Sequence, residues 1–128
     1  CDWSSDVCSS DLEQLQVWQK AKDLAVLIYK ITSDGKIAKD FSLRDQMRRS
    51  AISIASNIAE GDERDTDKES VRFFYIAKGS LAELRTQLRI ALEVDFLDKD
   101  EFAKVEQDCA EIGKMLGGLI KHRVGYRQ

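Results

Sequence analysis

Three arginines, Arg44, Arg48 and Arg49, cluster near the start of one helical segment. A guanidinium group presents a planar fork of N–H donors that can bind two phosphate oxygens at once, so the cluster is a candidate contact for RNA or DNA backbones. The alternative is structural, with the same groups pairing with carboxylates of neighbouring helices or of a neighbouring subunit. Positive charge at a helix N-terminus is opposed by the helix dipole, so another part of the molecule must hold these side chains there.

A second set of basic residues lies near the C-terminus, where Lys114, Lys121, Arg123 and Arg127 stand in a stretch without any acidic residue. Cations in the last turn of a helix complement its dipole, and charge runs often form solvated tails. The alternative is a contact with RNA or DNA phosphates made by several copies arrayed in a ring, since identical weak patches gain affinity through multivalency.

Asn57, Glu60 and Gly61 are predicted to shape the end of the arginine-bearing helix. We expect Asn57 and Glu60 to anchor the loop that follows, with a cationic or backbone partner for Glu60, because a carboxylate is unfavourable at a helix C-terminus. No base or nucleophile accompanies them, so no catalytic role is predicted. Gly61 is expected just past the helix, where glycine adopts the left-handed conformation without steric cost.

Gly79 and Ser80 interrupt a strongly apolar helical pattern. Glycine in a helix interior costs about 1 kcal/mol relative to alanine. This cost predicts the close approach of a neighbouring backbone, at the small residues Ser53 and Ser56. We therefore expect Gly79→Leu to prevent proper closure of the fold.

The chain lacks the residue sets that enzymes need. It has one histidine, no glycine-rich phosphate loop, no metal-ligand spacing and no nucleophile–base pair, so the sequence predicts no enzyme, no cofactor and no metal. Cys109 lies on an apolar helix face, where a thiol acts as a small hydrophobe. The absence of a disulfide framework fits the reducing cytoplasm, and no apolar run reaches the 18 or more residues of a membrane span.

The first twelve residues, CDWSSDVCSSDL, differ from the rest of the chain. They have no helical period and no signal-peptide features, and they resemble a translated sequencing-adapter remnant. We expect residues 1–12 to be a non-native or disordered leader and residues 13–128 to form a single domain. Without the three leader aspartates the chain has 20 basic and 20 acidic residues, so its overall field does not favour nucleic acid.

Apolar residues recur at intervals of three and four along most of the remaining chain, which predicts four amphipathic helices. The expected ranges are about 14–33, 42–60, 67–94 and 99–122. Ser42 is expected to cap the second helix, with Asp45 completing the box, and Thr66 with Glu69 forms a capping box for the third. Short loops between helices of this length predict an all-α, antiparallel up-down-up-down four-helix bundle.

Some apolar residues lie outside the face that each helix is expected to bury in the core. They are Trp18, Ile52, Ala55, Phe73 and Ile76. Apolar surface beyond what one bundle core requires indicates association. The sequence therefore predicts a homo-oligomer.

Three segments carry a family resemblance: QMRRSAISIASNIAEG, FYIAKGSLAELRTQLRIAL and EIGKMLGGLIK. They resemble the four helix bundle protein family, first noticed as products of intervening sequences in bacterial 23S ribosomal RNA genes. The resemblance covers about Val17 to Arg123. Family members often have Phe-Pro before the second helix and a proline within it, whereas this chain has no proline. Ala55 stands at the internal position, so we expect a straighter second helix.

The resemblance implies a bundle that assembles into ring-like homo-oligomers, commonly pentamers, without enzymatic activity. The chain is more distantly similar to accessory proteins of diversity-generating retroelements, basic rings that engage a reverse transcriptase and nucleic acid. The expected function is an oligomeric bacterial protein that associates with RNA or DNA through basic residues. These candidates are Arg44, Arg48, Arg49, Lys121, Arg123 and Arg127, with Asn57, Glu60, Gly61, Gly79 and Ser80 as structural or interface residues. The alternative is a protein-interaction scaffold, such as an accessory subunit of a reverse transcriptase.

Overall fold

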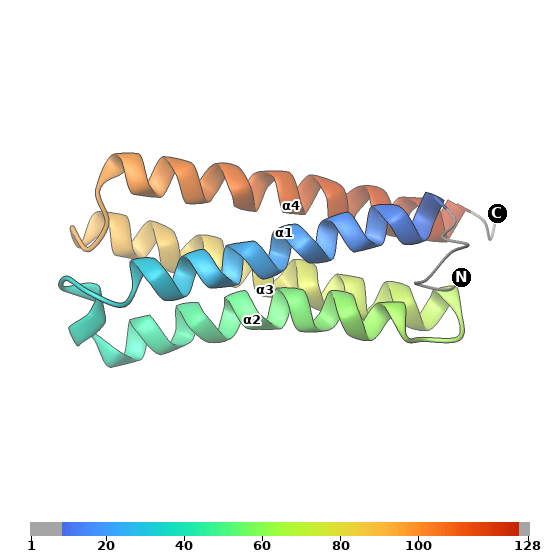
Figure 1. The fold of residues 1–128 in the computed structure, drawn as a ribbon, viewed down its shortest axis with the longest axis horizontal. Helices are drawn as coiled ribbons and strands as arrows, with labels where there is room; N and C mark the ends of the chain where they lie inside the picture. Colours follow the sequence, from blue (N-terminus) through green and yellow to red (C-terminus); the bar gives the residue numbers. More distant parts are fainter. Residues whose placement is uncertain (1–8, 126–128) are drawn as a thin grey trace.

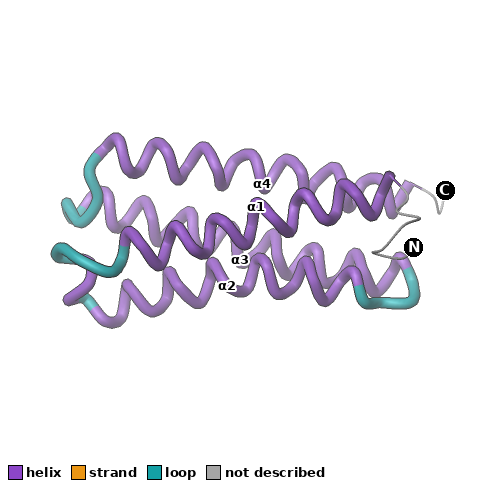
Figure 2. Tube along the Cα trace, in the orientation of Figure 1, coloured by secondary structure: helices purple, strands orange, loops and turns teal. Residues whose placement is uncertain are grey.

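The computed structural model of the chain describes residues 9–125, and long helices make up most of this part. The elements are α1 (Ser9–Ile31), the 3-10 turn η1 (Ile37–Lys39), α2 (Phe41–Asp62), α3 (Asp67–Glu93) and α4 (Lys99–Gly125). No strand occurs within these residues, which confirms the expected all-α class. Each long helix runs back along the one before it (Figure 1), and the connecting loops lie at the two ends of the molecule (Figure 2).

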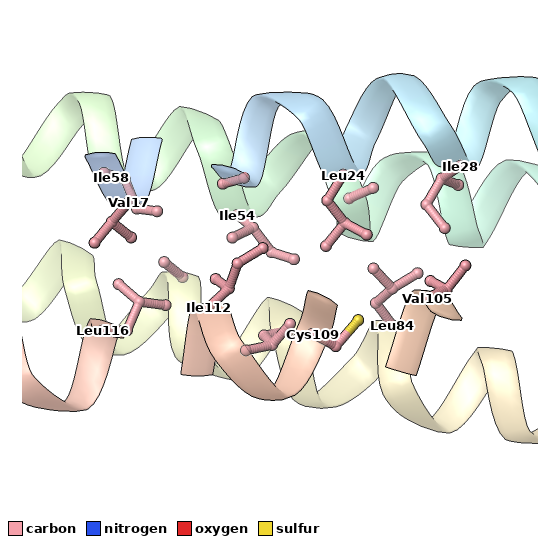
Figure 3. Packing of buried hydrophobic residues seen from close by; sticks show 14 of the residues in the cluster. Val17, Leu24, Ile28, Ile54, Ile58, Leu84, Val105, Cys109, Ile112 and Leu116 are labelled. Carbon is pink, nitrogen blue, oxygen red and sulfur yellow. The ribbon is translucent and has the colours of Figure 1, made fainter. Parts of the chain in front are cut away.

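The four helices enclose one core between them. Each helix packs against the next along the chain, and α1 also contacts α4, so the arrangement closes on itself. The contact between α2 and α3 is the most extensive of these, and the one between α1 and α4 is the least. In Figure 3, labelled side chains such as Leu24, Ile54, Leu84 and Ile112 converge from all four helices.

The apolar residues that were predicted to line one face of each helix form this core. Residues at the three- and four-residue intervals are almost fully buried, among them Ala21, Ile28, Met47, Phe74 and Leu116. Burying side chains of this kind stabilises the fold by about 1.5–3 kcal/mol each relative to leaving them exposed. The spacing of apolar residues therefore determined both the helices and the faces that they bury.

The helix starts depart from the predicted ones in two places. α1 begins at Ser9, ahead of the expected residue 14, so residues 9–12 of the supposed leader belong to a helix. Serine and aspartate suit a helix start, and extending a helix already formed is easy. Residues 1–8 lie outside the described part of the chain.

The second departure concerns the cap of α2. Asp40, not Ser42, is the N-cap, and its carboxylate accepts a hydrogen bond from the backbone N–H of Leu43 at 3.0 Å. Both residue types suit the position, so the sequence pattern did not distinguish them. The Thr66 cap of α3 is as expected, with its hydroxyl accepting from the N–H of Glu69 at 3.2 Å.

Cys109 is fully buried, as predicted. Burial raises the pKa of its thiol from 9.0 to about 12, because the apolar surroundings disfavour the thiolate. The thiol is therefore a packing group with little nucleophilic character.

We expect Cys109 to resist a thiol-reactive dye at pH 8 until the protein unfolds. A Cys1→Ser/Cys8→Ser variant leaves Cys109 as the single thiol for this measurement. Between pH 9 and about 12 the unfolded thiol loses its proton while the folded one keeps it, so this group lowers stability as pH rises through that window. Labelling of the folded protein as fast as that of the urea-unfolded chain would contradict the assignment.

Candidate functional site

Arg48 of α2 lies against the C-terminal end of α1. Its Nε donates to the buried Thr32 hydroxyl at 2.9 Å, one terminal nitrogen donates to the Tyr29 carbonyl at 3.5 Å, and the guanidinium stacks 4.5 Å from the Tyr29 ring. The last carbonyls of a helix lack intrahelical partners and carry partial negative charge. Arg48 lies about two turns into α2, beyond the reach of the dipole at the N-terminus of its own helix, and is well placed for the negative end of α1.

Arg44 is likewise engaged within the chain. It pairs with Asp45 at 2.9 Å, donates to the Ala38 carbonyl at 3.1 Å and lies 4.7 Å from the Phe41 ring. It therefore fixes the connection around η1 to the start of α2. Arg49, by contrast, is exposed and makes no hydrogen bond, ion pair or ring contact within residues 9–125. Of the three clustered arginines, it alone remains available for an outside anion.

We expect Arg48→Met, which keeps the apolar stem, to lower the free energy of unfolding by about 1–2 kcal/mol, because α1 loses the cation at its C-terminus. Arg49→Met, the adjacent arginine on the same helix, is the control and should change stability by less than about 0.5 kcal/mol. Urea titration followed by circular dichroism measures both. Equal losses in the two variants would count against the capping role of Arg48.

A shallow hollow of about 550 Å³ opens to solvent beside Arg49, between α1 and α2. Tyr29, Arg48, Arg49 and Ile52 are among its lining residues, and Tyr29 and Ile52 are each more than two-fifths exposed. An aromatic ring beside a free guanidinium is a combination found in single-stranded nucleic-acid sites. This hollow is therefore the candidate nucleic-acid interface.

The second basic set does not gather at this hollow. Arg123 is mostly buried, donates to Gln14 Oε1 at 2.7 Å and to the Asp67 carboxylate at 3.3 Å, and lies 5.5 Å from the Phe74 ring. It joins α4 to α1 and α3 and is not available to phosphates. Lys121 is exposed on α4, and Arg127 lies outside the described residues.

The predicted role of Gly61 is wrong. α2 continues through it to Asp62, and its backbone is not left-handed. A Cβ built at Gly61 would lie 2.5 Å from Cε1 of Phe74, so the glycine makes room for a ring of α3. Its carbonyl accepts a hydrogen bond from the buried Ser70 hydroxyl at 2.7 Å. The residue serves helix contact, not helix termination.

Asn57 also departs from expectation, while Glu60 follows it. The Asn57 amide donates to the carbonyl and hydroxyl of Ser53, at 2.8 and 3.0 Å, because a side chain well inside the helix meets the previous turn before it meets the loop. Glu60 forms an ion pair with Arg64 of the following loop, and Arg64 also lies 4.7 Å from the Phe73 ring. Glu60 therefore anchors the loop as predicted.

The close approach expected at Gly79 occurs one residue further on. Gly79 is exposed, and a Cβ added there would meet nothing within 4 Å. Ser80 is the buried residue of the pair, and its hydroxyl lies 2.8 Å from that of Ser53 on α2. The expectation for Gly79 is wrong among the described residues. α2 and α3 meet instead through the hydroxyl groups of Ser53 and Ser80.

Sequence reasoning missed the polar residues that hold the bundle ends, Gln14, Thr32 and Ser70, each almost fully buried. Their positions in the sequence could have indicated burial, because each continues the three- and four-residue spacing of the core residues. Gln14 comes three residues before Val17, and Thr32 comes four after Ile28. A polar residue at a core position needs a buried hydrogen-bond partner. The pattern could have identified the residues, but not their partners.

Two further features bear on function classes. Within residues 9–125, no group of three or more histidine, cysteine, aspartate or glutamate side chains could hold a metal ion. No helix in the same range is both long enough and apolar enough to cross a membrane.

Comparison with known proteins places the chain in a family. Residues 13–118 match the model of the 23S rRNA-intervening sequence protein family. The fold is similar to the crystal structure of a protein of unknown function from the S23 ribosomal protein family of Bacteroides thetaiotaomicron. The TM-score is 0.80 at 24% sequence identity, covering 85% of this chain and 98% of that one. No curated protein matches. Because the family model spans most of its length, the chain belongs to the 23S rRNA-intervening sequence protein family.

Proposed function

We propose that this protein is a non-enzymatic scaffold that assembles into a closed ring of identical copies through the outer side of α3. The observation that carries the proposal is the outer strip of α3, formed by Tyr75, Ile76, Gly79 and Ile90. Its three large apolar residues are 43–55% exposed. These residues are exposed on one side of α3, with the exposed Glu83 and Thr86 between Gly79 and Ile90 on the same side. A neighbouring subunit would cover the apolar side chains.

Gly79 adds a second argument for self-association. A mid-helix glycine costs about 1 kcal/mol, and nothing within residues 9–125 approaches Gly79 closely enough to offset that cost. A neighbouring subunit whose backbone packs at Gly79 would account for it. The family resemblance, which implies ring-like oligomers and commonly pentamers, agrees with this arrangement.

Light scattering tests the assembly. We expect the full chain at micromolar concentration to have several times the monomer mass, and Ile76→Glu to have the monomer mass with its helix content retained. Lys78→Glu is the matched control, because it also adds an acid two residues away but about 160° around the helix. A monomeric parent protein, or the same effect from both substitutions, would overturn the proposal.

Gly79→Leu tests whether the backbone of a neighbouring subunit packs closely at Gly79 or whether association depends only on exposed apolar surface. The chain has open space at Gly79, so the variant should fold and keep its helix content, contrary to what the sequence alone suggested. If a subunit backbone packs there, the leucine dissociates the ring although it adds apolar surface. A Gly79→Leu protein with unchanged oligomer mass would remove this residue from the interface.

The second candidate function is association with RNA or DNA, which the free guanidinium of Arg49 and the exposed Tyr29 favour. One arginine per chain binds phosphate weakly, whereas a ring presents several copies at once. Binding of a single-stranded RNA should fall steeply with salt and should weaken in Arg49→Gln more than in Lys68→Gln, a control at the opposite end of the bundle. A scaffold for a protein partner, such as a reverse transcriptase, would instead survive nuclease treatment in a pull-down.

A further inference from the structure

A pocket lies between the first turns of α1 and the last turns of α2, at the end of the bundle opposite Arg48. Its volume is about 340 Å³, within the range of small-molecule sites. Leu15, Trp18, Ile58 and Ala59 supply its apolar walls. The pocket has no part in the self-association or the phosphate contact proposed above.

One wall of this pocket carries a buried amide with an unused donor. Gln14 is 1% exposed, and its Oε1 accepts from Arg123 at 2.7 Å. Because a guanidinium only donates hydrogen bonds, this contact fixes which end of the amide is oxygen. Nε2 then has no hydrogen-bond partner. Buried donors are rarely left unsatisfied. The Nε2 atom is itself closed off from solvent, so an acceptor supplied by a bound molecule would reach it after a small shift of the Gln14 side chain towards the pocket.

The charge around the pocket is negative. Asp62 and Glu63 line it, and no basic side chain does so among the described residues. The nearest guanidinium, that of Arg123, lies behind Gln14 and is paired with Asp67. The carbonyl end of α2, which carries partial negative charge, lies at the same place. The Trp18 indole adds an aromatic face of the kind that attracts cations. These groups select a positively charged ligand.

We propose that this pocket binds a small organic cation, with the apolar body of the ligand against Trp18, its positive group near Glu63 and a hydrogen-bond acceptor facing Gln14. The apolar walls provide the contact area, the unpaired amide sets the orientation, and the Glu63 carboxylate disfavours anions. The site would give the protein a small-molecule ligand in addition to any macromolecular partner.

Tyramine is a suitable probe, since it combines an ammonium group, an aromatic body and a phenolic oxygen. A Trp3→Phe variant of the full chain makes Trp18 the single tryptophan, and its fluorescence reports on the pocket. We expect a saturable change with tyramine in the millimolar range. The neutral analogue 4-propylphenol should bind two- to fivefold more weakly because it lacks the ion pair. 2-Phenylethylamine, which lacks the oxygen, should bind about fivefold more weakly.

Two variants locate the binding. Ala59→Phe, at an exposed lining position, should weaken tyramine at least tenfold, whereas Ala82→Phe, an exposed alanine on α3, should leave it unchanged. Glu63→Gln should weaken tyramine but not 4-propylphenol. Melting temperatures confirm that each variant is folded, and Glu63, whose exposed side chain has no partner within residues 9–125, provides a test that does not disturb packing. Equal affinity for the three probes, no saturation, or binding unaffected by both pocket variants would overturn the proposal.

Discussion

Gly61→Ala is expected to lower the free energy of unfolding by about 1–3 kcal/mol. Two effects oppose each other at this position. Alanine is favoured over glycine in a helix by up to about 1 kcal/mol, but the added methyl group would lie 2.5 Å from Cε1 and 2.9 Å from Cδ1 of Phe74. The Phe74 ring is fully buried and has Arg123 over it at 5.5 Å, so it has little freedom to move. The clash therefore decides the sign.

Gly79→Ala is the matched control, because it makes the same substitution in the middle of a helix with open space around the new methyl group. It should leave the chain's own stability unchanged or raise it by up to about 1 kcal/mol, measured under conditions that keep the chain monomeric. A double-mutant cycle with Phe74→Leu completes the test, since removing the ring should relieve part of the Gly61→Ala cost. Destabilisation that is the same with and without the ring would rule out the steric explanation.

Arg123→Met should destabilise the protein by about 2–3 kcal/mol. The methionine keeps apolar contact with Phe74 but loses the hydrogen bond to Gln14 and the ion pair with Asp67. Charged hydrogen bonds of this kind contribute about 1.5–3 kcal/mol, and the Gln14 side chain, whose Nε2 already lacks a partner, would then have neither end of its amide satisfied. The half-exposed Asp67 contributes less, because solvent screens its charge.

Lys121→Met serves as the control for Arg123→Met, since Lys121 lies two residues earlier on α4 and is exposed. It should change stability by less than about 0.5 kcal/mol. Thermal and urea unfolding of the two variants give the comparison. Similar stabilities for the two proteins would mean that the Arg123 contacts contribute nothing net to the fold.

The helices and the core could be predicted because they follow from local periodicity. Apolar residues three and four apart share a helix face whatever surrounds them, so Leu24, Ile54 and Leu116 could be assigned to the core without coordinates. Cys109 could be assigned for the same reason. These predictions needed no knowledge of which helix lies opposite.

The two glycines show where such reasoning stops. Gly61 and Gly79 look alike in sequence, and either one could end a helix, admit a neighbour or face solvent. Which of these applies depends on the residue across the helix contact: Phe74 for Gly61, and none among the described residues for Gly79. Arg48 presents the same difficulty, because its acceptors on Thr32 and Tyr29 belong to a different helix. Partners of this kind are set by tertiary packing.

The unequal helix contacts imply an order of events in folding. α2 and α3 share the most extensive interface, tied by Ser53 and Ser80 and joined by a short loop, so this hairpin brings together residues close in sequence and pays little entropy for closure. α1 and α4 meet over the smallest contact and come from opposite ends of the chain. We therefore expect the α2–α3 hairpin to form first, and the contact between α1 and α4 to form last and open first. Native-state hydrogen exchange would show this as amides of α2 and α3 that outlast those of α1 and α4.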